Sequence, residues 1–251
     1  MPAGDSDARL AQAREMLAGT GYAPAPSFVE GGDVWAAQAA LLRDVEVRHV
    51  LDCGANLGLV SVEYRRVFPD ATIHAFEPVP ETHAKLTSRL GGDDRARLVQ
   101  AAITDRVGTA EITLGSAHYA DSIARRPEHE GGRRGTRVEI PTTTIDRYCA
   151  QESIHRVGVL KLDVEGVELE AIRGAERILG EDRVDLIFCE LNFSPRHAGA
   201  ARGSAVIEAL WEHGFRLFDL CLFERPDPAQ GLGWCDGIFV PESRHPGFAG
   251  L

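Results

Sequence analysis

From Val45 onward, strand-like apolar runs alternate with helical patterns, and this alternation constrains the fold more than any other feature. A run at 49–52 leads through a glycine turn into a helical pattern at 59–68. A second run at 72–77 leads into a helical pattern at 80–90. Strands that alternate with helices predict a mainly parallel sheet covered on both faces. We therefore expect a doubly wound, Rossmann-like α/β fold.

Further strand-like runs follow at 97–103, 157–163 and 185–190. The last two runs, at 215–220 and 237–241, are joined by a loop without a crossover helix. Such a connection predicts an antiparallel pair at one edge of the sheet.

The segment before Val45 holds two short helical patterns, at 5–18 and 33–43, separated by a stretch rich in Pro and Gly. Neither pattern is long enough to enclose a hydrophobic core. We expect a small N-terminal helical cap over residues 1–44 and one compact domain over residues 45–251, which suits a chain of 251 residues.

The composition narrows the classes of partner. The chain carries 27 basic and 38 acidic side chains, a formal charge of −11, so nucleic acid is not an expected partner. No apolar run reaches the roughly 18 residues of a membrane span, and the N-terminal residues lack the apolar core of a signal peptide, so no membrane association is expected. Five scattered cysteines, odd in number, indicate reduced thiols in a cytoplasmic protein.

The glycine turn after the first strand has the sequence DCGANLG, from Asp52 to Gly58. Gly54 and Gly58 permit a tight turn, and the following helix offers unpaired N–H groups to a ligand. Asn56 stands where the dehydrogenase fingerprint needs its middle glycine, and a carboxylate at Asp52 would repel a pyrophosphate. The same carboxylate suits an ammonium group, such as that of S-adenosylmethionine, whose own carboxylate can take the N–H groups of the turn.

Glu77 ends the second strand, 25 positions after Asp52. An acid at this place can accept hydrogen bonds from both ribose hydroxyls, in NAD sites and in S-adenosylmethionine sites alike. The alternative is that Gly54 and Gly58 only cap a helix and that Glu77 is solvated before Pro78. The strand, turn and helix on both sides favour a nucleoside cofactor.

Three segments together resemble the FkbM-type family of S-adenosylmethionine-dependent methyltransferases: VLDCGANLG, HAFEPVPE and LKLDVEGVELEAIRGA. The resemblance covers about Val45 to Phe193. It implies a class I methyltransferase fold, S-adenosylmethionine as methyl donor, and O-methylation of a sugar or natural-product hydroxyl. The resemblance matches Asp52, Gly54, Asn56 and Gly58 to the donor turn, Glu77 to the ribose acid, and Ala101 and Ala102 to the adenine side. We expect Ala55, Pro78 and Asp163 to belong to the donor site as well.

Two acids follow the fourth parallel strand. Asp163 lies at its carboxyl end, beside the expected methyl group, and Glu165 precedes the next helix. Both are candidates for the site. Glu168 and Glu170 are instead interpreted as acids that stabilise a helix N-terminus, by about 0.3–1 kcal/mol each.

Glu190 and Asn192 end the fifth strand, and alternation turns both to the side that could face Asp163. Three oxygen ligands on adjacent strand ends could hold Mg²⁺ and orient an alcohol. The favoured interpretation needs no metal, with Glu190 and Asn192 bonded to substrate or to a loop backbone.

Methyl transfer to a hydroxyl also needs a base, and histidine is the usual one near neutral pH. His118 and His197 lie on predicted loops that could cover the site, whereas His74 and His49 lie in strands and are expected to be structural. A basic cluster at 125–137 is either a solvated loop or a lid that attracts an anionic acceptor or a carrier protein.

The sequence therefore predicts a cytoplasmic S-adenosylmethionine-dependent O-methyltransferase acting on a small natural product or sugar. One rival is a NAD-dependent oxidoreductase. Another is a nucleoside-binding regulatory module without turnover. A homodimer is left open.

Overall fold

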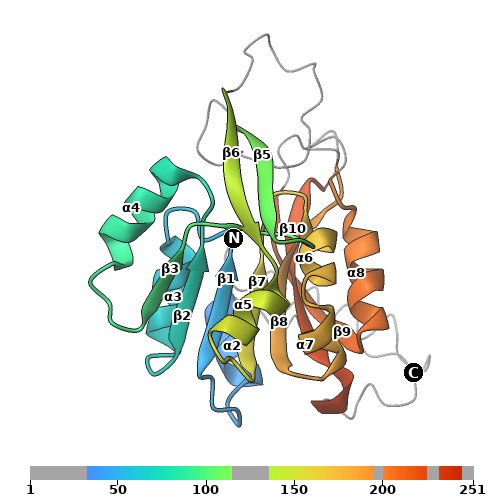
Figure 1. The fold of residues 1–251 in the computed structure, drawn as a ribbon. Helices are drawn as coiled ribbons and strands as arrows, with labels where there is room; N and C mark the ends of the chain where they lie inside the picture. The colour runs from blue at the N-terminus through green and yellow to red at the C-terminus, as the bar shows by residue number, and fades with distance from the viewer. Residues whose placement is uncertain (1–32, 115–135, 195–199, 225–231, 245–251) are drawn as a thin grey trace, which may run out of the picture.

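The computed structural model describes residues 33–114, 136–194, 200–224 and 232–244. Its centre is a seven-stranded sheet in the order β3-β2-β1-β7-β8-β10-β9 (Figure 1). These strands are β1 (His49–Cys53), β2 (Thr72–Phe76), β3 (Ala96–Val99), β7 (Val157–Leu162), β8 (Val184–Asn192), β9 (Phe215–Glu224) and β10 (Trp234–Pro241). The first five in this order are mutually parallel. The chain leaves β1 toward β2 and β3 and returns to β7 on the other side, which confirms the doubly wound fold.

The closing pair forms as predicted, because β10 runs antiparallel to both β8 and β9. The strand that runs antiparallel to both of its neighbours, β10, is not the edge strand of the sheet. β10 lies between β8 and β9, so that β9 is the outermost strand of the sheet.

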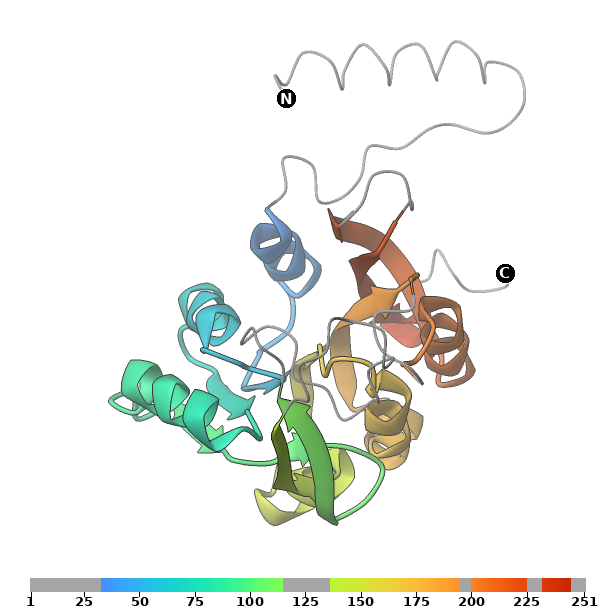
Figure 2. The same ribbon diagram turned by 90° about the horizontal axis from the view of Figure 1, so that it is seen from above.

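Helices cover both faces of the sheet (Figures 1 and 2). On one face, α2 (Val34–Leu41) and α3 (Leu59–Val67) share a core with Val50, Val159 and Ile238. On the other, Leu51, Leu160 and Phe239 pack with α5 (Ile145–Gln151), α6 (Glu168–Arg173), α7 (Glu176–Gly180) and α8 (Gly203–Glu212). Burial on both faces explains why β7 and β8 read as continuous apolar runs.

A second, three-stranded sheet stands beyond one end of the main sheet (Figure 1). It contains β4 (Ala102–Ile103), β5 (Gly108–Leu114) and β6 (Thr136–Thr143), in the order β4-β6-β5. The single strand predicted at 97–103 is therefore wrong. The chain breaks after Val99, where the Ala101 N–H donates to the Val99 carbonyl (3.0 Å), and β4 leaves the main sheet.

The predicted helix at 33–43 is α2, capped by the Asp33 carboxylate, which accepts the Ala36 N–H at 2.9 Å. Its Trp35 ring meets the Tyr64 ring edge-on, with 5.3 Å between centroids. Thus α2 packs into the core beside the sheet, while the boundary at residue 44 stays a prediction.

The helix predicted at 5–18 lies outside the described residues. Among the helices described, none combines the length and apolar character required to cross a bilayer.

Candidate functional site

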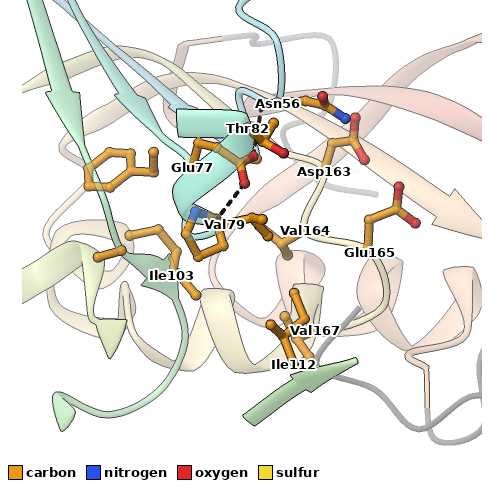
Figure 3. A pocket seen from close by; sticks show the side chains of 15 residues that line it. Asn56, Glu77, Val79, Thr82, Ile103, Ile112, Asp163, Val164, Glu165 and Val167 are labelled. Atoms are coloured by element: carbon orange, nitrogen blue, oxygen red, sulfur yellow. Dashed lines mark hydrogen bonds between the residues drawn. The ribbon is translucent and has the colours of Figure 1, made fainter. Parts of the chain in front are cut away.

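A pocket opens where the carboxyl ends of β1, β2 and β7 meet the small sheet (Figure 3). Glu77 and Val79 lie on one side of it, and Asp163, Val164 and Glu165 on the other. Its lining combines a few carboxylates with apolar side chains: Gly54, Asn56, Phe76, Glu77, Pro78, Val79, Thr82, Ala101, Ala102, Ile103, Ile112, Asp163, Val164, Glu165 and Val167.

Gly54 lets the end of β7 approach the turn after β1. Its φ is +83°, and a Cβ at this position would lie 1.8 Å from the Asp163 carbonyl oxygen. The N–H groups of Gly54 and Ala55 both donate to the Phe76 carbonyl, at 3.1 and 2.8 Å. The turn is thus fixed to β2 and β7 at once, which requires a residue without a side chain.

Glu77 has the best-defined geometry in the pocket. Its carboxylate is only 6% exposed. The Asn56 N–H donates to Oε2 at 3.1 Å, and the Val79 N–H donates to Oε1 at 2.9 Å (Figure 3). The carboxylate is therefore held in a single orientation, with its negative charge at the pocket wall.

The structure separates the predicted donor residues into two groups. Those that line the pocket are Gly54, Asn56, Glu77, Pro78, Ala101, Ala102 and Asp163. Asp52, Ala55 and Gly58 do not. Gly58 is the left-handed N-cap of α3, and Ala55 packs in the core beside Leu86. Because Ala55 and Gly58 lie on the side of the turn away from the pocket, we do not expect either residue to contact the donor.

Asp52 is wholly buried and turned away from the pocket. The Ser61 hydroxyl donates to its Oδ2 at 2.5 Å, and the Lys161 ammonium lies 3.0 Å from its Oδ1. Lys161 also donates to the Gly54 carbonyl at 2.9 Å and lies 3.4 Å from Asp163. Burial alone would lower the pKa of Lys161, but the charges of Asp52 and Asp163 raise it above its usual value. The geometry therefore favours a structural pair over the predicted contact of Asp52 with a ligand ammonium group.

Glu168 does not line the pocket, but it bonds to the backbone of the loop that does, so it is more than an acid at a helix end. Glu168 is fully buried, and its Oε1 accepts the N–H groups of Val164 and Gly166, at 3.3 and 3.0 Å. Burial raises its pKa to about 7. Glu170, as predicted, lies at the first turn of α6, where it pairs with Arg173.

Glu190 and Asn192 both belong to β8 and share a face, as predicted. The Asn192 amide donates to Glu190 Oε2 at 3.0 Å. Asp236 is the β10 partner of Glu190 in the register, so its side chain shares that face. Burial, and then the charge of Asp163, raise the pKa of Asp236 to about 7. Glu190 and Asn192 are buried and none of these three residues lines the pocket, so they form an acidic cluster inside the fold, near Asp163.

The metal site predicted at Asp163, Glu190 and Asn192 stays a prediction. In the part of the chain that the structure describes, no group of three or more His, Cys, Asp or Glu side chains has a metal-binding arrangement. The Asn192 amide is engaged with Glu190.

Of the histidines singled out in the sequence, the structure describes only some. His118 and His197 lie outside the described residues, as does the 125–137 cluster up to residue 135. Arg137 pairs with Glu111 at 3.1 Å on the surface of the small sheet. His74 is buried in the core, where it bonds to Tyr148, which agrees with its expected structural role.

A family model described as the methyltransferase FkbM domain matches residues 52–217. The chain belongs to the FkbM methyltransferase family. The match spans both halves of the pocket and most of the main sheet.

Two curated relatives of this FkbM methyltransferase illustrate the likeness. The 2-O-methyltransferase NoeI of Sinorhizobium fredii is 26% identical over 172 residues, covering 64% of this chain and 70% of that protein. The 31-O-demethyl-FK506 methyltransferase FkbM of Streptomyces tacrolimicus is 27% identical over 177 residues, covering 57% of this chain and 66% of the relative.

Among solved structures, a methyltransferase FkbM from Methylobacillus flagellatus superposes with a TM-score of 0.51 at 16% identity. The superposition covers 78% of this chain and 44% of that one. At this identity it shows the class I methyltransferase fold alone. This chain spans less than half of that structure.

Sequence reasoning missed two residues at the site of this FkbM methyltransferase. Lys161 gave no signal, because a lone lysine in an apolar strand has no local motif. Asp236 could have been suspected, since it is an acid at the start of an otherwise apolar run, WCDGIFVP. Its importance depends on pairing with β8, which the sequence does not encode locally.

Proposed function

We propose that this methyltransferase uses S-adenosylmethionine as donor and methylates a hydroxyl of a small natural product or sugar. The observation that carries the donor proposal is the Glu77 carboxylate, fixed by two backbone N–H groups at the pocket wall. Held in this way at the end of β2, the carboxylate is placed to accept hydrogen bonds from ribose hydroxyls.

The rest of the pocket fits the same donor. Apolar side chains of Ile103, Ile112 and Val164 offer a slot for a flat base. Gly54 and Asn56 bring the turn to the pocket surface, and the missing side chain at Gly54 leaves the pocket open for an amino-acid moiety. When bound, S-adenosylmethionine supplies a methyl group already activated on a sulfonium. The carboxylate of Asp163 lies at the opposite wall and favours a positive charge there.

The choice of oxygen as acceptor is supported by the two relatives, a 2-O-methyltransferase and a 31-O-demethyl-FK506 methyltransferase. The acidic cluster of Glu190, Asn192 and Asp236 adds negative charge near Asp163. It disfavours an anionic acceptor near the reacting centre, so we propose a neutral small molecule. The five cysteines are free thiols, which supports a cytoplasmic location.

Calorimetry with S-adenosylmethionine, S-adenosylhomocysteine and NAD tests the donor. We expect binding of the first two and none of NAD. Tight NAD binding would favour an oxidoreductase. Incubation with labelled donor and a panel of neutral sugars and polyketides, followed by mass spectrometry, then tests turnover. Donor binding with no transfer to any acceptor would favour the regulatory module.

A further inference from the structure

The loop 163–167 between β7 and α6 forms the pocket wall opposite Glu77 (Figure 3). Its backbone is held in an uncommon conformation, with φ of +56° at Glu165 and +102° at Gly166. A left-handed conformation is strained at a residue with a side chain. The loop therefore depends on contacts that hold it in place.

Glu168 provides two of these contacts. Its Oε1 accepts the N–H groups of Val164 and Gly166, the two residues that flank the strained Glu165. The side chain is 0% exposed, and Oε2 has no hydrogen-bond partner within the described residues. Oε1 therefore makes both hydrogen bonds to the loop, while Oε2 is buried and makes none within the described residues.

The other contacts of the loop tie it to elements on both sides. The Asp163 N–H donates to the Cys53 carbonyl at 3.2 Å, at the end of β1. The Gly166 carbonyl accepts the Ala201 N–H at 3.0 Å, just before α8 begins. Gly166 is consequently held through both of its backbone groups, by Glu168 on one side and by the segment that follows β8 on the other.

We infer that Glu168 is a positioning residue for the donor pocket, acting through the backbone of residues 164–166. By fixing this backbone it sets where the side chains of Val164 and Glu165 lie. The inference rests on the proposed function, because it concerns the wall of the proposed donor site. The competing account treats Glu168 as a negative charge that stabilises the N-terminus of α6.

Two conservative variants separate the accounts, because one keeps the oxygen in place and the other keeps the charge. Glu168→Gln retains an oxygen that can accept both N–H groups. Glu168→Asp retains the charge but is one methylene shorter, which takes the oxygen out of reach. Calorimetric titration with S-adenosylhomocysteine should give a Kd within about threefold of wild type for Glu168→Gln. For Glu168→Asp we expect a Kd at least tenfold weaker. The reverse order would overturn the inference in favour of charge.

Glu170→Gln is the matched control, because Glu170 lies in the same helical turn with its side chain 37% exposed. Within the described residues its carboxylate pairs with Arg173 and forms no hydrogen bond to the loop, so its Kd should equal that of wild type. If Glu168→Asp does not fold, Glu168→Gln still decides, since a tenfold loss of affinity there contradicts positioning by an oxygen.

Amide hydrogen exchange in the ligand-free protein gives a readout that does not depend on the donor. We expect Val164 and Gly166 to exchange slowly in wild type and Glu168→Gln, and at least tenfold faster in Glu168→Asp. Unchanged exchange in Glu168→Asp would refute the positioning role. If no variant, nor wild type, binds S-adenosylhomocysteine while exchange changes as expected, the proposed donor is wrong and the role in holding the loop stands.

Discussion

Lys161 is a single buried cation that holds two carboxylates and a turn together. It contacts Asp52, Asp163 and the Gly54 carbonyl from the interior of β7. Replacing it by Met leaves Asp52 buried without its counter-charge, which typically costs about 3–5 kcal/mol. We expect Lys161→Met to lower the free energy of unfolding by that amount in urea titration. Lys85→Met is the control, because Lys85 forms an exposed pair with Glu81 and its replacement should cost under about 1 kcal/mol. Equal costs would contradict the pairing.

Glu77 acts as a hydrogen-bond acceptor toward the turn and, in our proposal, toward the ribose. Glu77→Ala removes both sets of bonds, and hydrogen bonds to a charged group contribute about 1.5–3 kcal/mol. The Kd for S-adenosylhomocysteine should rise by roughly 10- to 100-fold in calorimetry. Glu81→Ala, at a side chain 71% exposed in the first turn of α4 (Pro80–Leu90), should leave it unchanged. An unaltered Kd in Glu77→Ala would remove Glu77 from the donor site.

The turn between β1 and α3 is the element on which the pocket depends most. A methyl group at Gly54 would overlap with the Asp163 carbonyl oxygen, and a backbone φ of +83° is strained for any residue with a side chain. Gly54→Ala is expected to separate the turn from β7 and to abolish donor binding, with a lowered Tm. Gly92→Ala provides the comparison, because a Cβ there meets nothing within 4 Å. Its Tm and Kd should stay at the wild-type values. Wild-type donor affinity in Gly54→Ala would show that the turn tolerates displacement.

Elements whose signal is local were predicted from the sequence. The glycine turn, the acid after β2 and the shared face of Glu190 and Asn192 follow from spacing and alternation within one segment. The pairing of Lys161 with Asp52 and of Asp236 with Glu190 joins strands that are distant in the chain. Neither pairing has a local pattern. The same limit applies to Glu168. Its place in the sequence is typical of an acid at a helix N-terminus, and its bonds to Val164 and Gly166 depend on how the loop folds.

At the scale of the molecule, alternation of strands and helices predicted the layers and the parallel sheet. It did not predict where β10 inserts, because strand order depends on which apolar faces meet after the chain collapses. It also merged β3 and β4 into one strand, since the break near Ala101 carries no glycine or proline. That break sends β4 into the small sheet, which closes the pocket with Ile103 and Ile112.

The stability of the whole molecule should depend on pH through His74. This residue is 3% exposed, with one ring nitrogen 2.8 Å from the Tyr148 hydroxyl and the other 3.1 Å from His49. Burial, and then the charges of His49 and Arg97, lower its pKa from 6.5 to about 3. The unfolded chain therefore takes up a proton first as the pH falls, and stability is lost below about pH 6.5.

Between pH 7 and pH 5 this loss amounts to about 2 kcal/mol, because each pKa unit corresponds to 1.36 kcal/mol. His74→Gln cannot titrate. The difference in unfolding free energy between wild type and His74→Gln should therefore shrink by about 2 kcal/mol when urea titrations at pH 7 are repeated at pH 5. Tyr148→Phe breaks the same hydrogen bond but keeps the buried imidazole, so its difference from wild type should change far less. A His74→Gln difference that is the same at both pH values would mean that His74 gains its proton equally well in the folded and unfolded states.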